Sequence, residues 1–264
     1  MDLPLFFLAL SLAAVIAAGA YLLHSLTLSG AVAAFFIIAA SLYFGSFSCF
    51  TVLVSSFFVI AVAGKLTKKR SAAITAGMHE KEGARDAVQV LANGAPAALC
   101  AFLFSLTGET GFVFAYFVAI GEALADSLAS DVGVLSKSEP RDILTLRKVV
   151  RGTSGGVSPL GTVAALAGAI FAAAISVFFY SFLPVTLLLI TAFIVAGVFL
   201  DSLLGARLQC RRQCKICGKM TEKTLHCGNP TTVVGGLRYL NNDAVNLLSN
   251  LMATVLAAVV FILI

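Results

Sequence analysis

Charged residues are scarce in this sequence, and their scarcity excludes an ordinary soluble domain. Only 12% of the 264 residues are Asp, Glu, Lys or Arg, whereas 59% are hydrophobic and the mean hydropathy is +1.00. Soluble domains carry about 25% charged residues. The apolar residues form repeated runs of about 20, the length of a membrane-spanning helix, and these runs are too long for the alternating strands of an outer-membrane barrel. The sequence predicts an all-α, polytopic membrane helix bundle.

Eight spans are expected, in a single integral-membrane domain that covers residues 1–264. They lie at about residues 3–23, 28–45, 47–64, 88–107, 110–127, 158–180, 183–204 and 243–263. The first span follows Asp2 and lacks the basic segment of a cleavable signal peptide, so we expect it to be retained. Only the stretch YFGSFS separates the second span from the third.

Lysine and arginine are absent from the interior of every expected span. All 18 fall in three connections, residues 64–87, 128–157 and 205–242, whereas the opposite turns LTGET and SFLP carry none. Basic connections stay on the cytoplasmic side of a membrane. The pattern therefore predicts cytoplasmic catalytic loops and both termini outside. Short loops and the lack of a transit-like N-terminus favour a prokaryotic cell membrane.

Polar residues recur at helical spacing where four spans meet this side. The stripes are Arg85, Gln89 and Asn93; Glu122, Asp126 and Ser130, with Ser127 and Asp131 beside them; Asp201 and Ser202; and Asp243, Asn246 and Asn250, capped by Asn241 or Asn242. Hydrogen bonds between packed helices would explain any one stripe. Four stripes at one depth predict a shared polar pocket. A weak repeat, GEALADSLAS and GVFLDSLLGA, predicts comparable places for Asp126 and Asp201, although such repeats also occur in transporters.

A glycine-rich segment in the second loop predicts phosphate binding. Lys148 and Arg151 precede a run of small residues, Gly152, Thr153, Ser154, Gly155 and Gly156. Glycine lets backbone N–H groups approach an anion, and the following helix N-terminus adds a favourable dipole. The segment is neither a Walker A motif nor a dinucleotide fingerprint. A flexible loop that enters a helix is the alternative.

Cysteine and histidine gather in the third loop. Cys214 and Cys217 are followed by His226 and Cys227, a spacing that can bind zinc tetrahedrally. The two pairs lie closer together than in most zinc ribbons, and a reducing cytoplasm would also leave plain thiols. We expect a structural Zn²⁺ or free thiols here rather than a disulfide.

Several blocks between residues 64 and 250 resemble the membrane family of plant phytyl-phosphate kinases of the vitamin E pathway and its archaeal and bacterial relatives. The blocks are KLTKKRSAAITAG with GARDAVQVLANG, ALADSLASDVGVLS, RGTSGGVSPLGT, DSLLGARLQ and NNDAVNLLSN. More remotely, ADSLASDVG is similar to an element of CTP-dependent phytol and dolichol kinases, which have Gly in place of Ala125. The resemblance implies phosphoryl transfer from an NTP, with CTP favoured, to a polyprenyl or phytyl monophosphate.

The resemblance also implies roles for particular residues. Asp126 and Asp131 would hold Mg²⁺, and residues 151–156 would cradle the nucleotide phosphates. A block that contains Asn242, Asp243 and Asn246 would complete the site.

Phosphoryl-transfer chemistry adds further candidates on the same membrane face. Mg²⁺ prefers carboxylate oxygens, so Asp201 and Asp243 are candidate metal ligands as well. Neutralising the phosphates is the role we expect of Arg85, Lys148 and Arg151. Asn93 is expected to add a contact to nucleotide or phosphate.

Other functions fit the same residues. A cytidylyltransferase would use the same two substrates to make a CDP-linked lipid, and sequence does not decide between the two reactions. A secondary transporter would use the carboxylates as ion or substrate sites, and a scaffold would use them to pack helices. The expected partners are an isoprenoid-phosphate lipid, a nucleotide and membrane lipids, without nucleic acid. A homo-oligomer is compatible with the sequence.

Overall fold

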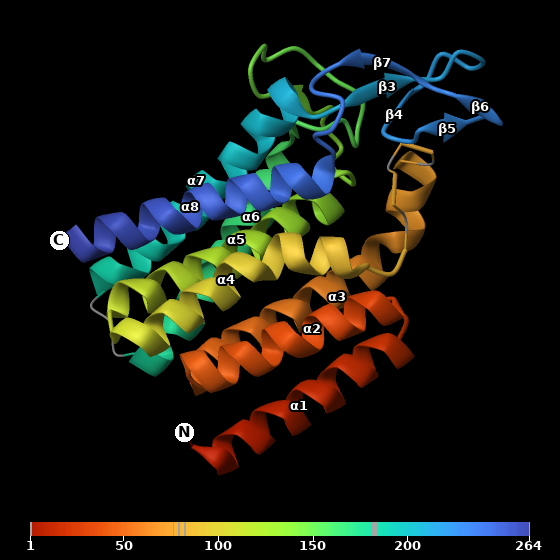
Figure 1. Cartoon of the computed structure of the whole chain (residues 1–264). Coiled ribbons are helices and arrows are strands. Elements are labelled where there is room, and N and C mark those ends of the chain that lie inside the picture. The colour runs from red at the N-terminus through yellow and green to blue at the C-terminus, as the bar shows by residue number, and fades with distance from the viewer. Residues whose placement is uncertain (1, 76, 79, 82, 181–183, 264) are drawn as a thin grey trace.

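Helices make up most of the chain (Figure 1). A computed structural model describes every residue except 1, 76, 79, 82, 181–183 and 264. The helices are α1 (Leu3–Leu22), α2 (Leu28–Ala40) with a π-helical turn η1 (Ser41–Gly45), α3 (Phe47–Thr75), α4 (Ala87–Thr107), α5 (Thr110–Gly133), α6 (Pro159–Tyr180), α7 (Pro184–Leu208) and α8 (Asn242–Leu263). Within the described residues, eight are long and apolar enough to cross a membrane. The expected all-α polytopic bundle is confirmed.

Three helices continue beyond the spans that hydropathy marks. α3 ends at Thr75, α5 at Gly133 and α7 at Leu208, four to eleven residues past the expected ends. Hydropathy reports how much of a helix lies in lipid, whereas the helix itself continues as long as its backbone is hydrogen-bonded. Asp131 therefore lies on α5 and not in the loop that follows it.

The centre of the bundle is α5. Every residue from Val113 to Ala125 is buried, and α3, α4, α6, α7 and α8 all pack against this helix. Small residues permit close approach, since a side chain at Gly121 would meet Ile194 and one at Gly168 would meet Ala125. The acidic residues of this helix consequently face protein and not hydrocarbon.

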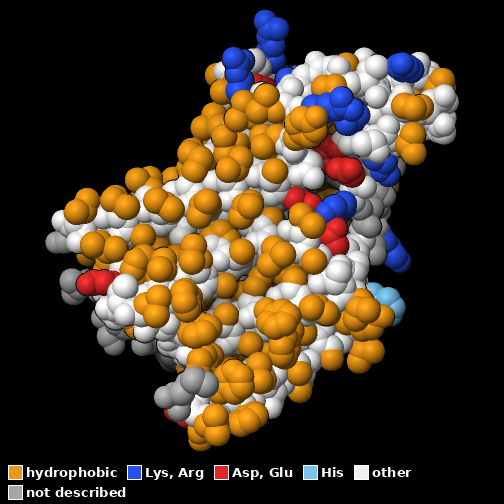
Figure 2. Space-filling view, in the orientation of Figure 1, with side chains coloured by type: hydrophobic (Ala, Val, Ile, Leu, Met, Phe, Trp, Pro, Cys, Tyr) orange, Lys and Arg blue, Asp and Glu red, His pale blue; other side chains and the backbone are white. Residues whose placement is uncertain are grey.

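Short strands occupy the connections at one end of the bundle. β1 (Arg141–Asp142) pairs with β2 (Gly156–Val157), and β5 (Leu225–His226) pairs with β6 (Asn229–Pro230). β3 (Arg211–Gln213) lies between β4 (Met220–Thr221) and β7 (Thr232–Gly235) in an antiparallel sheet. We call this end of the bundle the loop end; both chain termini lie at the other end (Figure 1). Lys and Arg side chains gather at the loop end, above a surface that is otherwise largely hydrophobic (Figure 2).

Side-chain caps start two of the helices at the loop end, α4 and α8. Asp86 accepts a hydrogen bond from the backbone of Gln89 at 3.0 Å, and the Gln89 side chain accepts one from the backbone of Asp86 at 3.2 Å. This capping box begins α4. Asn241 accepts a hydrogen bond from the backbone of Ala244 at 3.0 Å and so caps α8, one of the two expected positions.

Candidate functional site

A cavity of about 650 Å³ opens at the loop end, between α5, α6 and α7. We call it the polar pocket. Its polar wall consists of Asp126, Ser130, Asp131, Arg151, Gly152, Thr153, Ser154, Gly155, Gly156, Asp201, Ser202 and Asn242, together with Lys81 and Glu222. Residues from three connections and from the ends of three helices therefore meet in one space.

Three aspartates, Asp126, Asp131 and Asp201, lie on this wall, in addition to Glu222. The first two come from α5 and the third from α7. Carboxylate oxygens are the ligands that Mg²⁺ prefers, and Mg²⁺ sites in nucleotide enzymes use one or two of them together with substrate phosphates. One or two of these carboxylates, together with substrate phosphates, would suit a magnesium ion.

A buried network beneath the wall contacts one of these acids, Asp201. Glu122, one turn deeper than Asp126, is 2% exposed and accepts a hydrogen bond from the Asn250 amide at 2.6 Å. The Ser249 hydroxyl lies 3.3 Å from Glu122 and 3.0 Å from Asp201. A hydroxyl has one hydrogen to donate, and the Asn246 carbonyl at 3.1 Å is a third acceptor beside the two carboxylates. Glu122 is thus a positioning residue below the pocket.

The glycine-rich segment forms an ordered turn over the end of α7. Gly152 and Gly155 have φ of +82° and +76°, conformations that glycine adopts without strain. A side chain at Gly155 would collide with Ala206, and the Ser154 hydroxyl donates to Gln209 at 2.6 Å. Among the hydrogen bonds between described residues, none uses the backbone N–H of Gly152, Ser154 or Gly155. Three N–H donors of a turn that lines the pocket therefore have no hydrogen-bond partner among the described residues.

Of the two basic residues before this turn, only one lines the pocket. Arg151 lies on the pocket wall, where its guanidinium donates to the Lys137 carbonyl at 3.2 Å. Lys148 was expected at the site, but its ammonium pairs with Glu139 at 2.8 Å and is 68% exposed, off the wall. Hydrogen bonding to Lys148 lowers the pKa of Glu139. β1 and β2 turn the chain so that Lys148 points to solvent.

Lys81 is a wall residue that sequence reasoning missed. Its ammonium contacts Asp243 at 2.5 Å and Asp86 at 2.7 Å. Burial would lower the pKa of Lys81, but hydrogen bonds to the two carboxylates outweigh it and the pKa is raised. Asp243, expected as a magnesium ligand, is paired with this cation and does not line the pocket. The loop before α4 crosses to α8, a contact that no local pattern signals.

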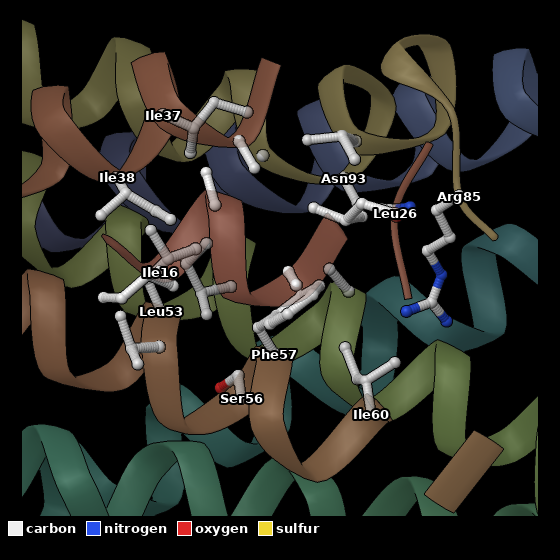
Figure 3. A pocket seen from close by; sticks show the side chains of 18 of the residues that line it. Ile16, Leu26, Ile37, Ile38, Leu53, Ser56, Phe57, Ile60, Arg85 and Asn93 are labelled. Carbon is white, nitrogen blue, oxygen red and sulfur yellow. The ribbon is translucent and has the colours of Figure 1, made fainter. Parts of the chain in front are cut away.

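Arg85 and Asn93 lie on the opposite side of α5, not on the wall of the polar pocket. They line a separate, largely apolar cavity of about 100 Å³ formed mostly by α1–α5 (Figure 3). The Asn93 amide donates to the Gln89 carbonyl of its own helix at 3.0 Å. Burial lowers the pKa of Arg85, and the carboxylates of Asp131 and Asp126 oppose that shift. Arg85 can therefore act on the acids only as a charge at a distance.

Asn246 also lies behind the wall and not on it. In the amide orientation that pairs each donor with an acceptor, Asn246 donates to Asp201 at 3.2 Å and to the Asn242 carbonyl at 3.0 Å. It was expected to contact nucleotide, but its geometry orients Asp201. Asn242 itself does line the pocket.

The cysteine and histidine residues of the third loop form a cluster that could hold a metal ion. The ligand atoms of Cys214, Cys217, His226 and Cys227 all lie within 4.8 Å of one another. Backbone N–H groups of Cys217 and Ile216 lower the pKa of Cys214 to about 6. Hydrogen bonding to Cys217 raises the pKa of Cys227 to about 11.

Comparison with known proteins shows similarity to a family of integral membrane proteins. A family model described as "Integral membrane protein DUF92" matches residues 11–254. Protein PGR of Arabidopsis thaliana is 30% identical, over 95% of this chain and 94% of its own. An uncharacterized membrane protein of Methanocaldococcus jannaschii, MJ0933, is 31% identical over 74% of this chain and 76% of its own. Protein VTE6, chloroplastic, of Arabidopsis thaliana is 25% identical over 78% and 56%. No solved structure matches.

Proposed function

Since the chain belongs to the DUF92 family of integral membrane proteins, we propose that it is a membrane kinase that phosphorylates an isoprenoid monophosphate. The phosphoryl donor is an NTP, with CTP preferred, and the product is the diphosphate. One observation carries the proposal: three aspartates share one pocket with a glycine-rich turn in which three backbone N–H groups have no hydrogen-bond partner among the described residues. The motif resemblance to plant phytyl-phosphate kinases supports the reaction class.

The position of the pocket favours a kinase over a secondary transporter. Transporter sites lie near the bilayer midplane, at interrupted helices. The polar pocket lies instead where α5 and α7 end and where the basic loops begin. We propose that this loop end faces the cytoplasm, because every lysine and arginine lies there and because nucleoside triphosphates are cytoplasmic.

The residues of the pocket divide the work of phosphoryl transfer. Asp126, Asp131 and Asp201 would hold Mg²⁺, which would neutralise charge on the nucleotide phosphates. The N–H groups of the glycine-rich turn would bind phosphate oxygens. Arg151, whose guanidinium borders the same space, would attract the acceptor phosphate. Such groups act by positioning and by charge stabilisation, which is most of what this reaction requires.

The proposed reaction does not require a strong general base. An oxygen of the acceptor monophosphate, already anionic, attacks the γ-phosphorus of the NTP. One P–O bond forms, the bond from the γ-phosphorus to the β–γ bridging oxygen breaks, and the nucleoside diphosphate leaves. Attack at the α-phosphorus would instead release pyrophosphate and leave a CDP-linked lipid.

Isotope position separates these two reactions. Purified protein in detergent is incubated with Mg²⁺, phytyl or geranylgeranyl monophosphate, and CTP labelled either at the α- or at the γ-phosphorus. We expect the γ label in the lipid and the α label in released CDP. An α-labelled lipid with released pyrophosphate would establish the cytidylyltransferase. Unlabelled lipid with all four NTPs and both acceptors would exclude both activities.

The lipid chain of the acceptor has an apolar route out of the same pocket. Beyond its polar wall the pocket continues between α6 and α7, along Ala165, Leu166, Val195, Val198 and Phe199. Leu166 and Phe199 are 46% and 38% exposed, so this route reaches the surface of the bundle. We propose that the isoprenoid chain lies there.

Filling this route should discriminate against long acceptors. Ala165→Phe would displace two or three methylene groups, about 2 kcal/mol of burial, and should raise KM for a twenty-carbon acceptor roughly 30-fold. A five-carbon acceptor such as dimethylallyl phosphate should be affected far less. Val163→Phe is the matched control, because Val163 is on the same helix, 64% exposed and off the pocket wall. Equal effects on both chain lengths would contradict the route.

A further inference from the structure

The Cys/His cluster of the third loop stands apart from the polar pocket but is connected to its rim. We propose that Cys214, Cys217, His226 and Cys227 bind one Zn²⁺ ion, and that this ion holds the rim of the polar pocket in place. The metal site does not depend on the reaction proposed above, because it rests on a separate set of residues.

The spacing of the four donors fits a tetrahedral zinc site. The Cys217 and Cys227 sulfurs lie 3.6 and 3.2 Å from Nδ1 of His226. With Zn–S near 2.3 Å and Zn–N near 2.0 Å, the edges of a tetrahedral site are about 3.5–3.8 Å. A slight adjustment of side chains therefore brings all four atoms to bonding distance of one ion.

The first pair of ligands lies on a tight turn between β3 and β4. The backbone of Cys214 exchanges hydrogen bonds with this turn, donating to Lys219 at 3.0 Å and accepting from Gly218 at 3.0 Å. The Ile216 N–H points at the sulfur of Cys214, 3.4 Å away. N–H groups directed at a sulfur stabilise the thiolate, which is the form that binds metal.

The second pair lies where β5 ends and the turn to β6 begins, with His226 on the strand and Cys227 on the turn. Cys227 has φ of +51°, in the left-handed region that a residue with a side chain rarely adopts. Strain of this kind is kept where the surrounding structure requires it. Here the conformation brings the Cys227 sulfur and the His226 ring to the same point.

The donor chemistry selects zinc over the alternatives. Three sulfurs and one imidazole nitrogen form one of the standard structural zinc sets, whereas magnesium and calcium require oxygen ligands. All six cysteines of the chain are free thiols. A disulfide within the cluster would also leave its third sulfur without a partner.

The loop has almost no hydrophobic core of its own. Between Arg211 and Leu240 only Cys214, Thr221 and Thr231 are buried, while apolar side chains such as Ile216 and Leu225 are exposed. Segments this small need a metal or disulfide to hold one structure. A zinc ion supplies that constraint here.

The cluster is joined to the pocket through the segment between its two turns. The Thr221 hydroxyl donates to the Gly77 carbonyl at 2.7 Å, and the Glu222 backbone donates to the Met78 carbonyl at 2.7 Å. The Glu222 side chain accepts from the Glu80 backbone at 3.3 Å. The connection that carries Lys81 to the pocket wall is therefore held by the metal-binding loop.

The same glutamate reaches the glycine-rich turn. Glu222 accepts a hydrogen bond from the Gln209 amide at 2.7 Å, and Gln209 accepts one from Ser154 at 2.6 Å. Loss of the metal should therefore loosen both the segment before α4 and the phosphate-binding turn, without affecting the packing of the spans.

Metal analysis tests the site. Protein purified in detergent without added metal should contain about one zinc per chain, and Cys217→Ser and Cys227→Ser should each lose most of it. Cys210→Ser is the matched control, since Cys210 is in the same loop but outside the cluster. Replacement by Co²⁺ should give the visible spectrum of a tetrahedral thiolate site. Zinc-free wild-type protein that cannot take up Co²⁺, or full zinc in both variants, would overturn the site.

Limited trypsin digestion tests the link to the rim. Chelation, or Cys217→Ser, should accelerate cleavage by tenfold or more in the loop that contains Arg211, Lys215 and Lys219, and also after Lys81. Elution of the protein as the same detergent-bound species would show that the bundle is intact. Faster cleavage in the loop with no change after Lys81 would overturn the proposed role at the rim.

Discussion

Replacing Asp126 with asparagine should lower the rate of phosphoryl transfer about 10³-fold and leave the protein as stable as before, or more stable. The carboxylate lies on the pocket wall, close enough to Asp131 and Asp201 for like charges to repel. Asparagine keeps the shape of the side chain, removes that repulsion and removes a strong magnesium ligand. Loss of one charge-stabilising group typically lowers kcat by about 10²–10³, and we expect a loss of about 10³.

Loss of activity with retained stability would distinguish a carboxylate that acts in catalysis from one that only packs helices together. If the polar stripes only joined helices, Asp126→Asn would lower the melting temperature and leave ligand binding unaltered. Glu109→Gln is the matched control, because Glu109 is the N-cap of α5, at the opposite end of the helix from Asp126, and its side chain makes no capping hydrogen bond. Activity within threefold of wild type in Asp126→Asn, measured by γ-label transfer, would remove Asp126 from the mechanism.

Gly155→Ala should lower kcat/KM by about 10² through the shape of the phosphate-binding turn. Its φ of +76° disfavours any side chain, and the new Cβ would collide with the backbone of Ala206 on α7. The turn must then move away from α7, which displaces the N–H groups from the bound phosphates. A misplacement of about 1 Å can cost 10²-fold in rate.

A second glycine separates displacement of the turn from simple backbone strain. Gly108 ends α4 with φ of +71°, and nothing lies within 4 Å of a side chain built there. Gly108→Ala should therefore cost about 1–2 kcal/mol of stability and leave kcat/KM unchanged. Thermal unfolding and label transfer measured on both variants make the comparison. Equal losses of activity would indicate that strain alone is responsible.

The sequence predicts those parts of the site whose residues lie close together in the chain or share a helix face. The four candidate zinc ligands, from Cys214 to Cys227, lie within fourteen residues of the sequence. Their spacing alone was therefore enough to predict a cluster. The predicted topology puts the ends of several helices and their connections on one side of the membrane. That prediction grouped Asp126, Asp131 and Asp201 with residues 151–156. Periodicity identifies which residues share a helix face. It does not tell which neighbour that face packs against.

Arg85 and Asn93 show that limit. They lie at the depth of the pocket, yet α5 stands between them and it. Even adjacent residues of α5 line different cavities: Asp126 lines the polar pocket and Ser127 lines the apolar cavity. The pairing of Lys81 with Asp243 joins residues 162 positions apart. Such a contact follows only from the packed bundle.

The burial of Glu122 also determines the order in which this protein can be built into a membrane. Its hydrogen-bond partners Ser249 and Asn250 follow 127 and 128 residues later in the chain. At about 5–20 residues per second, a ribosome needs roughly 6–25 s to supply them. An acidic side chain in hydrocarbon costs about 2.5–3.5 kcal/mol at a helix centre. We therefore expect α5 to remain in contact with the translocon or with earlier helices until α8 has been synthesised and inserted.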